Sequence, residues 1–237
     1  MAVLPDNQYT NMQVAQYDRD AEGMIATDHQ HHNLNPYYWS HILGPVHLNP
    51  GYYMYGRRPC RAMDFGCGCG RNVRNLLCYG VFDQVVGVDL CEKHIKHCKR
   101  ALPFPKAEFI KSNGVDLKCL YGIAEPFDFI MSTIVFQHIC VRDIRQGLLA
   151  EIARWTAHNG IFSLQMGFGN SKRDSVDYFD NNWEATGTNA ACDTRVEDKT
   201  HLFTDLESVG FEIVDCAIVP SWSDSHDRWI IVHGKKS

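Results

Sequence analysis

Residues 62–71 read AMDFGCGCGR. Three glycines, Gly66, Gly68 and Gly70, occupy alternate positions directly after a short apolar run, and Asp64 lies two residues before the first of them. A glycine-rich turn between a strand and a helix brings backbone N–H groups and the positive end of the helix close to a bound anion. The stretch therefore predicts a β-strand, a ligand-binding turn and an α-helix in succession.

The spacing of these glycines disfavours a dinucleotide as the ligand. A dinucleotide-binding turn carries glycines at its first, third and sixth positions, and the last of them allows close packing of the helix. Counted from Gly66, the sixth position is Arg71. We therefore expect a different ligand against this turn.

Length and charge limit the class of protein. With 237 residues and 45% hydrophobic content, the chain can bury the core of one undivided α/β domain. Its net charge of -5 argues against a broad basic face that holds a nucleic-acid backbone. The composition therefore favours a small molecule over a polyanion as the substrate and disfavours nucleic acid as a partner.

Cysteine usage and the first residues predict the compartment. Ten cysteines are scattered from Cys60 to Cys216, and the opening MAVLPDNQYT lacks the basic start and apolar core of a signal peptide. No run approaches the roughly 20 apolar residues that a membrane helix needs. We expect a cytoplasmic protein that does not contact a membrane.

Short apolar runs alternate with helical patterns from Arg61 onward, which is typical of a parallel sheet flanked by helices. In the helix expected after the glycines, Val73 and Leu76 share one face and Gly80 ends the helix. A short polar turn joins the last two strands and predicts that they are antiparallel. The expected strands are 61–65, 84–90, 107–114, 127–139, 160–166, 211–220 and 228–234, and the expected helices are 71–80, 91–102, 142–160 and 202–210.

The expected organisation is a core with one N-terminal addition. Residues 1–60, rich in Tyr, His, Asn and Pro, are interpreted as a helical cap or lid, and residues 61–237 as the core. Within the core, the pattern breaks at about 167–199, which is rich in Gly, Asn, Asp and Ser. Long irregular insertions in compact domains are commonly functional, so we expect this one on the substrate side.

From about Arg61 to Met166 the chain resembles the class I S-adenosylmethionine-dependent methyltransferases. The first motif of that family is an acid followed by alternating glycines, here DFGCGCG, and Asp89 ends the second expected strand nineteen residues after Gly70. FDFIMSTIVFQHI matches the fourth-strand motif, and LLAEIARWTAHNGIFSLQM resembles the helix and strand that follow it. The resemblance implies a Rossmann-like seven-stranded, mostly parallel sheet with helices on both faces and an antiparallel C-terminal strand.

The resemblance also implies S-adenosylmethionine as cofactor and S-adenosylhomocysteine as product. On this interpretation the amino-acid tail and ribose lie against the glycines, Asp64 provides a counter-charge, and Asp89 accepts hydrogen bonds from the ribose hydroxyls. Asn113 would accept from the adenine amine, although the family often has an acid there. Leu90 and Val115 would enclose the ring. The expected cofactor-binding residues are Asp64, Gly66, Cys67, Gly68, Gly70, Asp89, Leu90, Asn113, Gly114, Val115, Thr133, Gln137 and His138.

Histidines are the candidates for a general base, because an acceptor hydroxyl or protonated amine must lose a proton. We expect His32 or His138 in this role: His32 precedes an aromatic pair that could wall a pocket, and His138 follows the fourth-strand motif. A structural role is open for both, and His29, His31 and His226 are further candidates. The cluster DHQHH at 28–32 also admits a metal, but it lacks the defined thiolate or carboxylate spacing of zinc sites, so no metal is expected.

The resemblance thus implies methyl transfer to an oxygen, nitrogen or carbon of a small-molecule metabolite, for example a sugar or a natural-product intermediate. A protein or RNA methyltransferase, or a non-catalytic scaffold that binds the cofactor, are the alternatives. A monomer or a homodimer is equally compatible with the sequence.

Overall fold

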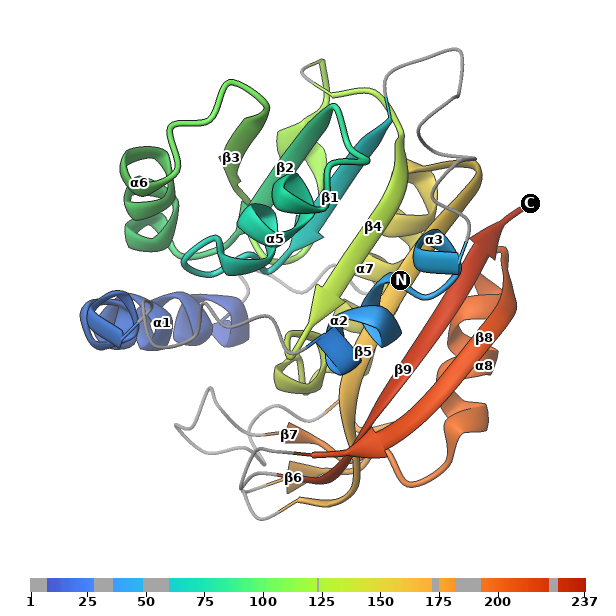
Figure 1. Cartoon of the computed structure of the whole chain (residues 1–237). Coiled ribbons are helices and arrows are strands. Elements are labelled where there is room, and N and C mark those ends of the chain that lie inside the picture. The colour runs from blue at the N-terminus through green and yellow to red at the C-terminus, as the bar shows by residue number, and fades with distance from the viewer. Residues whose placement is uncertain are drawn as a thin grey trace.

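A seven-stranded sheet forms the centre of the structure, a computed structural model that describes residues 8–27, 36–48, 60–122, 124–171, 175–181, 193–221 and 226–237. The strand order is β3-β2-β1-β4-β5-β9-β8 (Figure 1). Strands β1 to β5 are parallel, and β9 runs antiparallel to both β5 and β8. The strands are β1 Arg61–Phe65, β2 Gln84–Asp89, β3 Ala107–Lys111, β4 Phe127–Thr133, β5 Thr156–Ser171, β8 Phe211–Pro220 and β9 His226–Lys236. The predicted Rossmann-like α/β sheet is confirmed.

Helices cover both faces of this sheet. One apolar core holds buried side chains of α2, α3, α5 and α6, and the other holds those of α7 and α8 together with Tyr9 of α1. The α-helices are α1 Gln8–Thr27, α2 Pro36–Leu43, α3 Pro45–Leu48, α5 Arg71–Tyr79, α6 Glu92–Ala101, α7 Arg142–Trp155 and α8 Lys199–Ser208. Two 3₁₀ turns, η2 Lys118–Leu120 and η3 Phe136–His138, follow β3 and β4.

The helix after the glycine turn forms where the pattern predicts it. Val73 and Leu76 are buried, and Gly80 ends α5 in the left-handed region with φ 80°, its N–H donating to the carbonyl of Leu77. A residue with a side chain takes up this conformation only with strain, so glycine is the usual stop signal.

The predicted boundary between the fourth helix and the fifth strand is wrong in position. α7 ends at Trp155, because Thr156 already pairs with Phe127 of β4 and its hydroxyl donates to the carbonyl of Ile152. Asn159, which lies within the expected helix 142–160, adopts a φ of 63° inside β5 instead. The same strand continues to Ser171, so the first residues of the expected 167–199 insertion belong to the sheet.

The rest of the expected insertion contains a second, two-stranded sheet. Its strands are β6 Ser175–Val176 and β7 Asp193–Thr194, which pair in parallel. In Figure 1 this small sheet lies beyond the carboxyl end of β4, on the same edge of the molecule as α1. The insertion therefore reaches the edge where ligands bind in open α/β sheets.

The N-terminal helices are tied directly to the sheet. Ile42 of α2 is fully buried, and its carbonyl accepts a hydrogen bond of 2.7 Å from the hydroxyl of Ser163 in β5. The ring of His233 in β9 lies 3.1 Å from the same carbonyl. Within the described ranges, no helix is long and apolar enough to cross a membrane, and no disulfide joins the cysteines that the structure describes.

Candidate active site

A cavity of about 330 Å³ opens at the carboxyl ends of the central strands. The turn after β1, the ends of β2 and β4, and the segment after β3 line one side of it. The other side is one face of α1, with Gln13, Tyr17, Met24 and Thr27 in the lining. The strand order reverses between β1 and β4, and such switch points are where open α/β sheets bind their ligands.

The glycine turn is shaped by left-handed backbone. Gly66, Gly68 and Gly70 have φ of 79°, 50° and 85°, and the N–H groups of Gly66 and Cys67 both donate to the carbonyl of Val88. A Cβ on Gly66 would lie 2.2 Å from Cγ2 of Val135, which a real atom cannot do. Glycine is therefore required at position 66 both for conformation and for space.

Substituting Gly66 tests this double requirement. Gly80 has the same backbone conformation, with φ 80°, but nothing lies within 4 Å of a Cβ built there. We expect Gly80→Ala to cost about 1–2 kcal/mol of unfolding free energy for the left-handed backbone alone. Gly66→Ala should cost about 1–3 kcal/mol more because of overpacking against Val135, and Val135→Ala in the same chain should restore that difference. Urea denaturation measures both, and equal costs at the two positions would contradict the packing argument.

Asp89 lies at the carboxyl end of β2 and lines the cavity. Its Oδ2 accepts from the N–H of Gly68 at 2.8 Å and its Oδ1 from the N–H of Cys91 at 2.8 Å. Each carboxylate oxygen can accept more than one hydrogen bond. The side chain is therefore fixed in place and still able to accept from a ligand's hydroxyl groups.

Asp64 is buried directly behind the glycine turn. No described residue donates a hydrogen bond to either of its carboxylate oxygens, and the side chain is 1% exposed. Burial raises the pKa of this carboxyl to about 7, while Arg71 opposes the increase and Asp89 adds to it. Buried polar groups are nearly always paired, so an unpaired acid here indicates a ligand or water contact.

Ser112 and the predicted Gly114 line the cavity at the end of β3, whereas the predicted Asn113 and Val115 do not. The Asn113 side chain is exposed, and its Oδ1 accepts from the N–H groups of Val115 and Asp116 at 3.0 Å each. Asn113 thus forms a local turn rather than a cavity wall. Its contact with adenine stays a prediction from the sequence.

The segment after β4 contributes a strained residue. Ile134 lines the cavity with a φ of 59°, which is rare for a β-branched side chain. Thr133 before it also lines the cavity, and its hydroxyl accepts from the amide of Asn72 at 2.9 Å. Such strain commonly concentrates at ligand sites.

The predicted site residues separate into two groups. Gly66, Cys67, Gly68, Asp89, Leu90, Gly114, Thr133 and His138 line the cavity, whereas Asp64, Gly70, Asn113, Val115 and Gln137 are outside the lining. Gly70 is the N-cap of α5, and Gln137 is buried with its Oε1 accepting from the N–H of Gly167 at 2.8 Å.

Of the histidine candidates, His138 lines the cavity and His226 does not. His32, His29 and His31 lie outside the described residues. Among the residues that the structure describes, no group of three His, Cys, Asp or Glu side chains could hold a metal ion.

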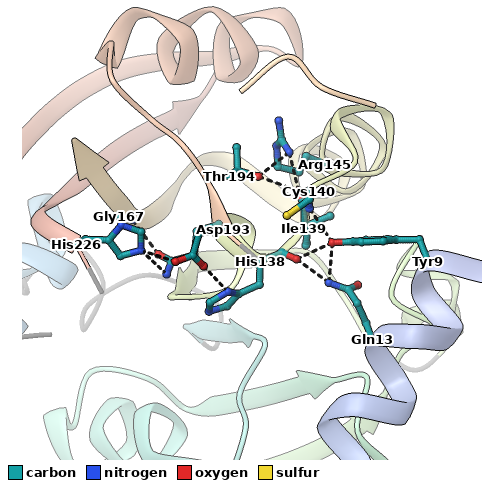
Figure 2. A network of polar contacts seen from close by, with 11 residues as sticks. Tyr9, Gln13, His138, Ile139, Cys140, Arg145, Gly167, Asp193, Thr194 and His226 are labelled. Atoms are coloured by element: carbon teal, nitrogen blue, oxygen red, sulfur yellow. Dashed lines mark hydrogen bonds and ion pairs between the residues drawn. The ribbon is translucent and has the colours of Figure 1, made fainter. Parts of the chain in front are cut away.

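His138 contacts a buried carboxylate that sequence reasoning missed. Nδ1 of His138 lies 2.7 Å from Oδ1 of Asp193, and Oδ2 of Asp193 lies 2.9 Å from Nε2 of His226 (Figure 2). Asp193 comes from β7, in the irregular segment, and no local pattern connects it to either histidine. The sequence indicated a role for Asp193 only through its place in the insertion after the fifth strand, which was expected on the substrate side.

The first helix fixes the backbone of the same histidine. Tyr9 donates its hydroxyl hydrogen to the carbonyl of His138 at 2.6 Å and accepts from the N–H of Cys140 at 2.7 Å. Gln13 donates to the same carbonyl at 2.7 Å, as Figure 2 shows. α1 therefore both walls the cavity and holds η3 in position.

Comparison with known proteins agrees with this geometry. Residues 63–164 match the family model described as methyltransferase domain. A chain from the complex between the Haloferax volcanii Trm112 methyltransferase activator and the putative methyltransferase has a TM-score of 0.63 at 13% identity, over 94% of this chain and 96% of that chain. The magnesium protoporphyrin IX methyltransferase ChlM from Synechocystis PCC 6803, with bound S-adenosylmethionine, has a TM-score of 0.60 at 13% identity, over 97% of both chains. A methyltransferase from Methanosarcina mazei has a TM-score of 0.59 at 18% identity, over 79% and 97%. None of the curated proteins matches the sequence.

The cavity chemistry fits S-adenosylmethionine. The left-handed glycine turn permits close approach of a ligand, Asp89 retains acceptor capacity for hydroxyl groups, and the unpaired Asp64 suits a cationic group or a water molecule beside it. Together with the strand order, these features agree with the family match: residues 63–164 form a methyltransferase domain, and the sheet around it has the Rossmann-like strand order.

Proposed function

We propose that this methyltransferase acts on an oxygen, nitrogen or carbon of a small-molecule metabolite. The observation that carries the proposal is the cavity itself, which has a volume of about 330 Å³ and is walled on one side by a face of α1. Gln13, in that face, donates a hydrogen bond to the carbonyl of His138. This bond connects α1 directly to the residues of the site.

The cofactor is assigned to the side of the cavity formed by β1, β2 and β3. We assign its amino-acid tail to the turn at Gly66 and Gly68, its ribose to Asp89, and its adenine to the space between Leu90 and Gly114. When bound, S-adenosylmethionine supplies a methyl carbon whose bond to sulfur breaks with the electron pair left on sulfur. The chain's part is to orient the acceptor, to exclude water and to remove a proton where the acceptor carries one.

His138 is the proposed base. It lies in the cavity lining beyond β4, with its side chain 12% exposed, and imidazole is the most common general base in enzymes. His32, the other candidate, remains a proposal from the sequence alone.

Two further observations favour a small acceptor. The net charge of -5 does not suit a polyanionic substrate. The similar structure named magnesium protoporphyrin IX methyltransferase is matched over 97% of both chains, so a chain of this fold and length is compatible with a small-molecule acceptor.

The proposal is tested by measuring release of S-adenosylhomocysteine with a panel of phenols, carboxylic acids, amines and sugars, beside bulk tRNA and an unfolded protein. We expect acceptor-dependent release with at least one small-molecule class and none with the macromolecules. Release with tRNA or protein alone would overturn the proposal in favour of a macromolecular substrate.

Replacing Asp89 tests the cofactor assignment. We expect Asp89→Ala to weaken S-adenosylmethionine binding by about 1.5–3 kcal/mol, because a charged acceptor for the ribose is lost. Asp83→Ala is the matched control, since Asp83 also accepts one backbone N–H, from Cys60 at 2.9 Å, but is absent from the cavity lining. Isothermal titration calorimetry measures both, and unchanged affinity in Asp89→Ala would refute the ribose assignment.

A further inference from the structure

We propose that Asp193, which His226 also contacts, is a positioning residue that fixes His138 as a general base through Nε2, and that the acceptor therefore carries an O–H or N–H proton. The proposal rests on the proposed function, which it deepens by naming the acceptor chemistry. Its basis is that His138 of η3 and His226 of β9 both contact the buried carboxylate of Asp193, which belongs to β7 (Figure 2).

Asp193 carries a negative charge in the interior. The residue is fully buried. Burial alone would raise the pKa of this carboxyl, but the contacts from His138 and His226 lower it below the ordinary carboxyl value. A buried carboxylate needs donors on both oxygens, because an unpaired charge in the interior costs several kcal/mol.

The carboxylate selects the tautomer of His138. Nδ1 lies 2.7 Å from the negatively charged Oδ1 of Asp193, so a proton on Nδ1 is favoured over a lone pair there. A neutral imidazole with its proton on Nδ1 has a bare Nε2, which is a proton acceptor. Nε2 is at the opposite edge of the ring, and His138 lines the cavity, so we take this nitrogen to be the one that a ligand reaches.

His226 occupies the second oxygen and is itself closely held. Its Nε2 lies 2.9 Å from Oδ2 of Asp193 and 3.1 Å from the amide nitrogen of Gln137. A Cβ on Gly167 would lie 2.3 Å from the His226 ring, so only glycine allows this approach. The Gly167 N–H donates to Gln137, which links β5 to the same cluster.

Arg145 holds the two segments that bear His138 and Asp193. Its Nη1 donates to the carbonyl of Ile139 at 2.6 Å and to the hydroxyl of Thr194 at 3.0 Å. These partners are the residues that directly follow His138 and Asp193 in the chain. The buried, charge-assisted hydrogen bonds of Arg145 thus hold in place the two segments whose side chains, His138 and Asp193, are in contact.

The proton balance defines the acceptor. As the acceptor atom forms its bond to the methyl carbon, its O–H or N–H bond breaks and the proton moves to Nε2 of His138. The imidazolium that forms is stabilised by the Asp193 carboxylate and afterwards releases the proton to solvent. An acceptor that is already an anion gains nothing from this base, whereas a phenol, alcohol or protonated nitrogen does.

The first test reads the tautomer in the protein without cofactor or acceptor. Nitrogen-15 shifts of imidazole distinguish a protonated from a bare ring nitrogen, and the His138 signals are assigned by their loss in His138→Gln. We expect a protonated Nδ1 and a bare Nε2 in the wild type, and loss of this preference in Asp193→Asn. A protonated Nε2 in the wild type overturns the proposal, and this readout does not depend on the folding of any Asp193 variant.

The second test compares two acceptors with S-adenosylmethionine, phenol and the thiolate of 4-nitrothiophenol, which is ionised at neutral pH. Asp193→Asn should reduce kcat for phenol on the order of 10²–10⁴-fold but for the thiolate by no more than about tenfold. His226→Gln, which keeps the carboxylate, should retain the tautomer and lose far less activity. If Asp193→Asn lowers kcat equally for both acceptors while the cofactor affinity is unchanged, the role of Asp193 is merely structural and the proposal fails. If the wild type transfers no methyl group to any acceptor, the proposed function fails, and the tautomer still decides the role of Asp193.

Discussion

Arg145→Met is expected to lower the free energy of unfolding by about 3–5 kcal/mol, because a buried charged donor with several acceptors is lost. The side chain is 2% exposed, and beside its bonds to Ile139 and Thr194 it donates to the carbonyl of Tyr178 and lies over that residue's ring. Methionine fills a similar volume but offers these oxygens no hydrogen. The measurement is chemical denaturation followed by tryptophan fluorescence.

Arg154→Met on the same helix is the matched control. Arg154 is largely exposed, bonds the Tyr121 hydroxyl and lies 3.6 Å from Glu151, so we expect a cost of about 0.5–1 kcal/mol at most. A similar small cost for Arg145→Met would mean that the segments bearing His138 and Asp193 are held by packing rather than by the guanidinium.

Stability should fall as pH rises through the range in which Asp64 titrates. Burial raises the pKa of its carboxyl from 3.8 to about 7 in the folded chain. Between these values the folded state holds a proton that the unfolded state has lost, so increasing pH favours unfolding, and the effect levels off above about 7. The full shift corresponds to roughly 4 kcal/mol.

Asp64→Asn isolates this contribution because it removes the titrating group and keeps the shape. We expect the stability of the wild type, measured relative to Asp64→Asn in urea, to decline between about pH 4 and pH 7. Parallel pH curves for the two proteins would show that Asp64 titrates normally and that a buried partner satisfies it.

Features that depend on local chain conformation could be predicted from the sequence. The glycine turn, the stop of α5 at Gly80 and the position of Asp89 at the end of β2 all follow from the spacing of residues within one strand–turn–helix unit. Such units have few backbone solutions, and glycine marks the points where the backbone must be left-handed.

Local pattern could not distinguish a ligand contact from a turn contact at Asn113. The side chain of asparagine is well suited to both, and here it accepts from two backbone N–H groups that follow it. The end of α7 was misplaced for a related reason. Pairing of Thr156 with β4 is a tertiary contact, and it ends the helix before the expected residue 160.

The contacts around His138 could not be predicted because they join segments that are distant in sequence. Tyr9, Asp193 and His226 meet at η3 from α1, β7 and β9, and none of the three lies in a motif. Their proximity is a consequence of topology: the carboxyl ends of parallel strands share one edge, and the insertion after β5 returns to it.

The place of β9 in the sheet has a consequence for biosynthesis. β9 lies between β5 and β8, and β8 pairs with no other strand of the described chain. The first residues of β9 must therefore leave the ribosome before β8 gains a partner and His226 reaches Asp193. Until then the growing chain exposes an unpaired strand edge, the kind of surface on which nascent proteins associate and chaperones act.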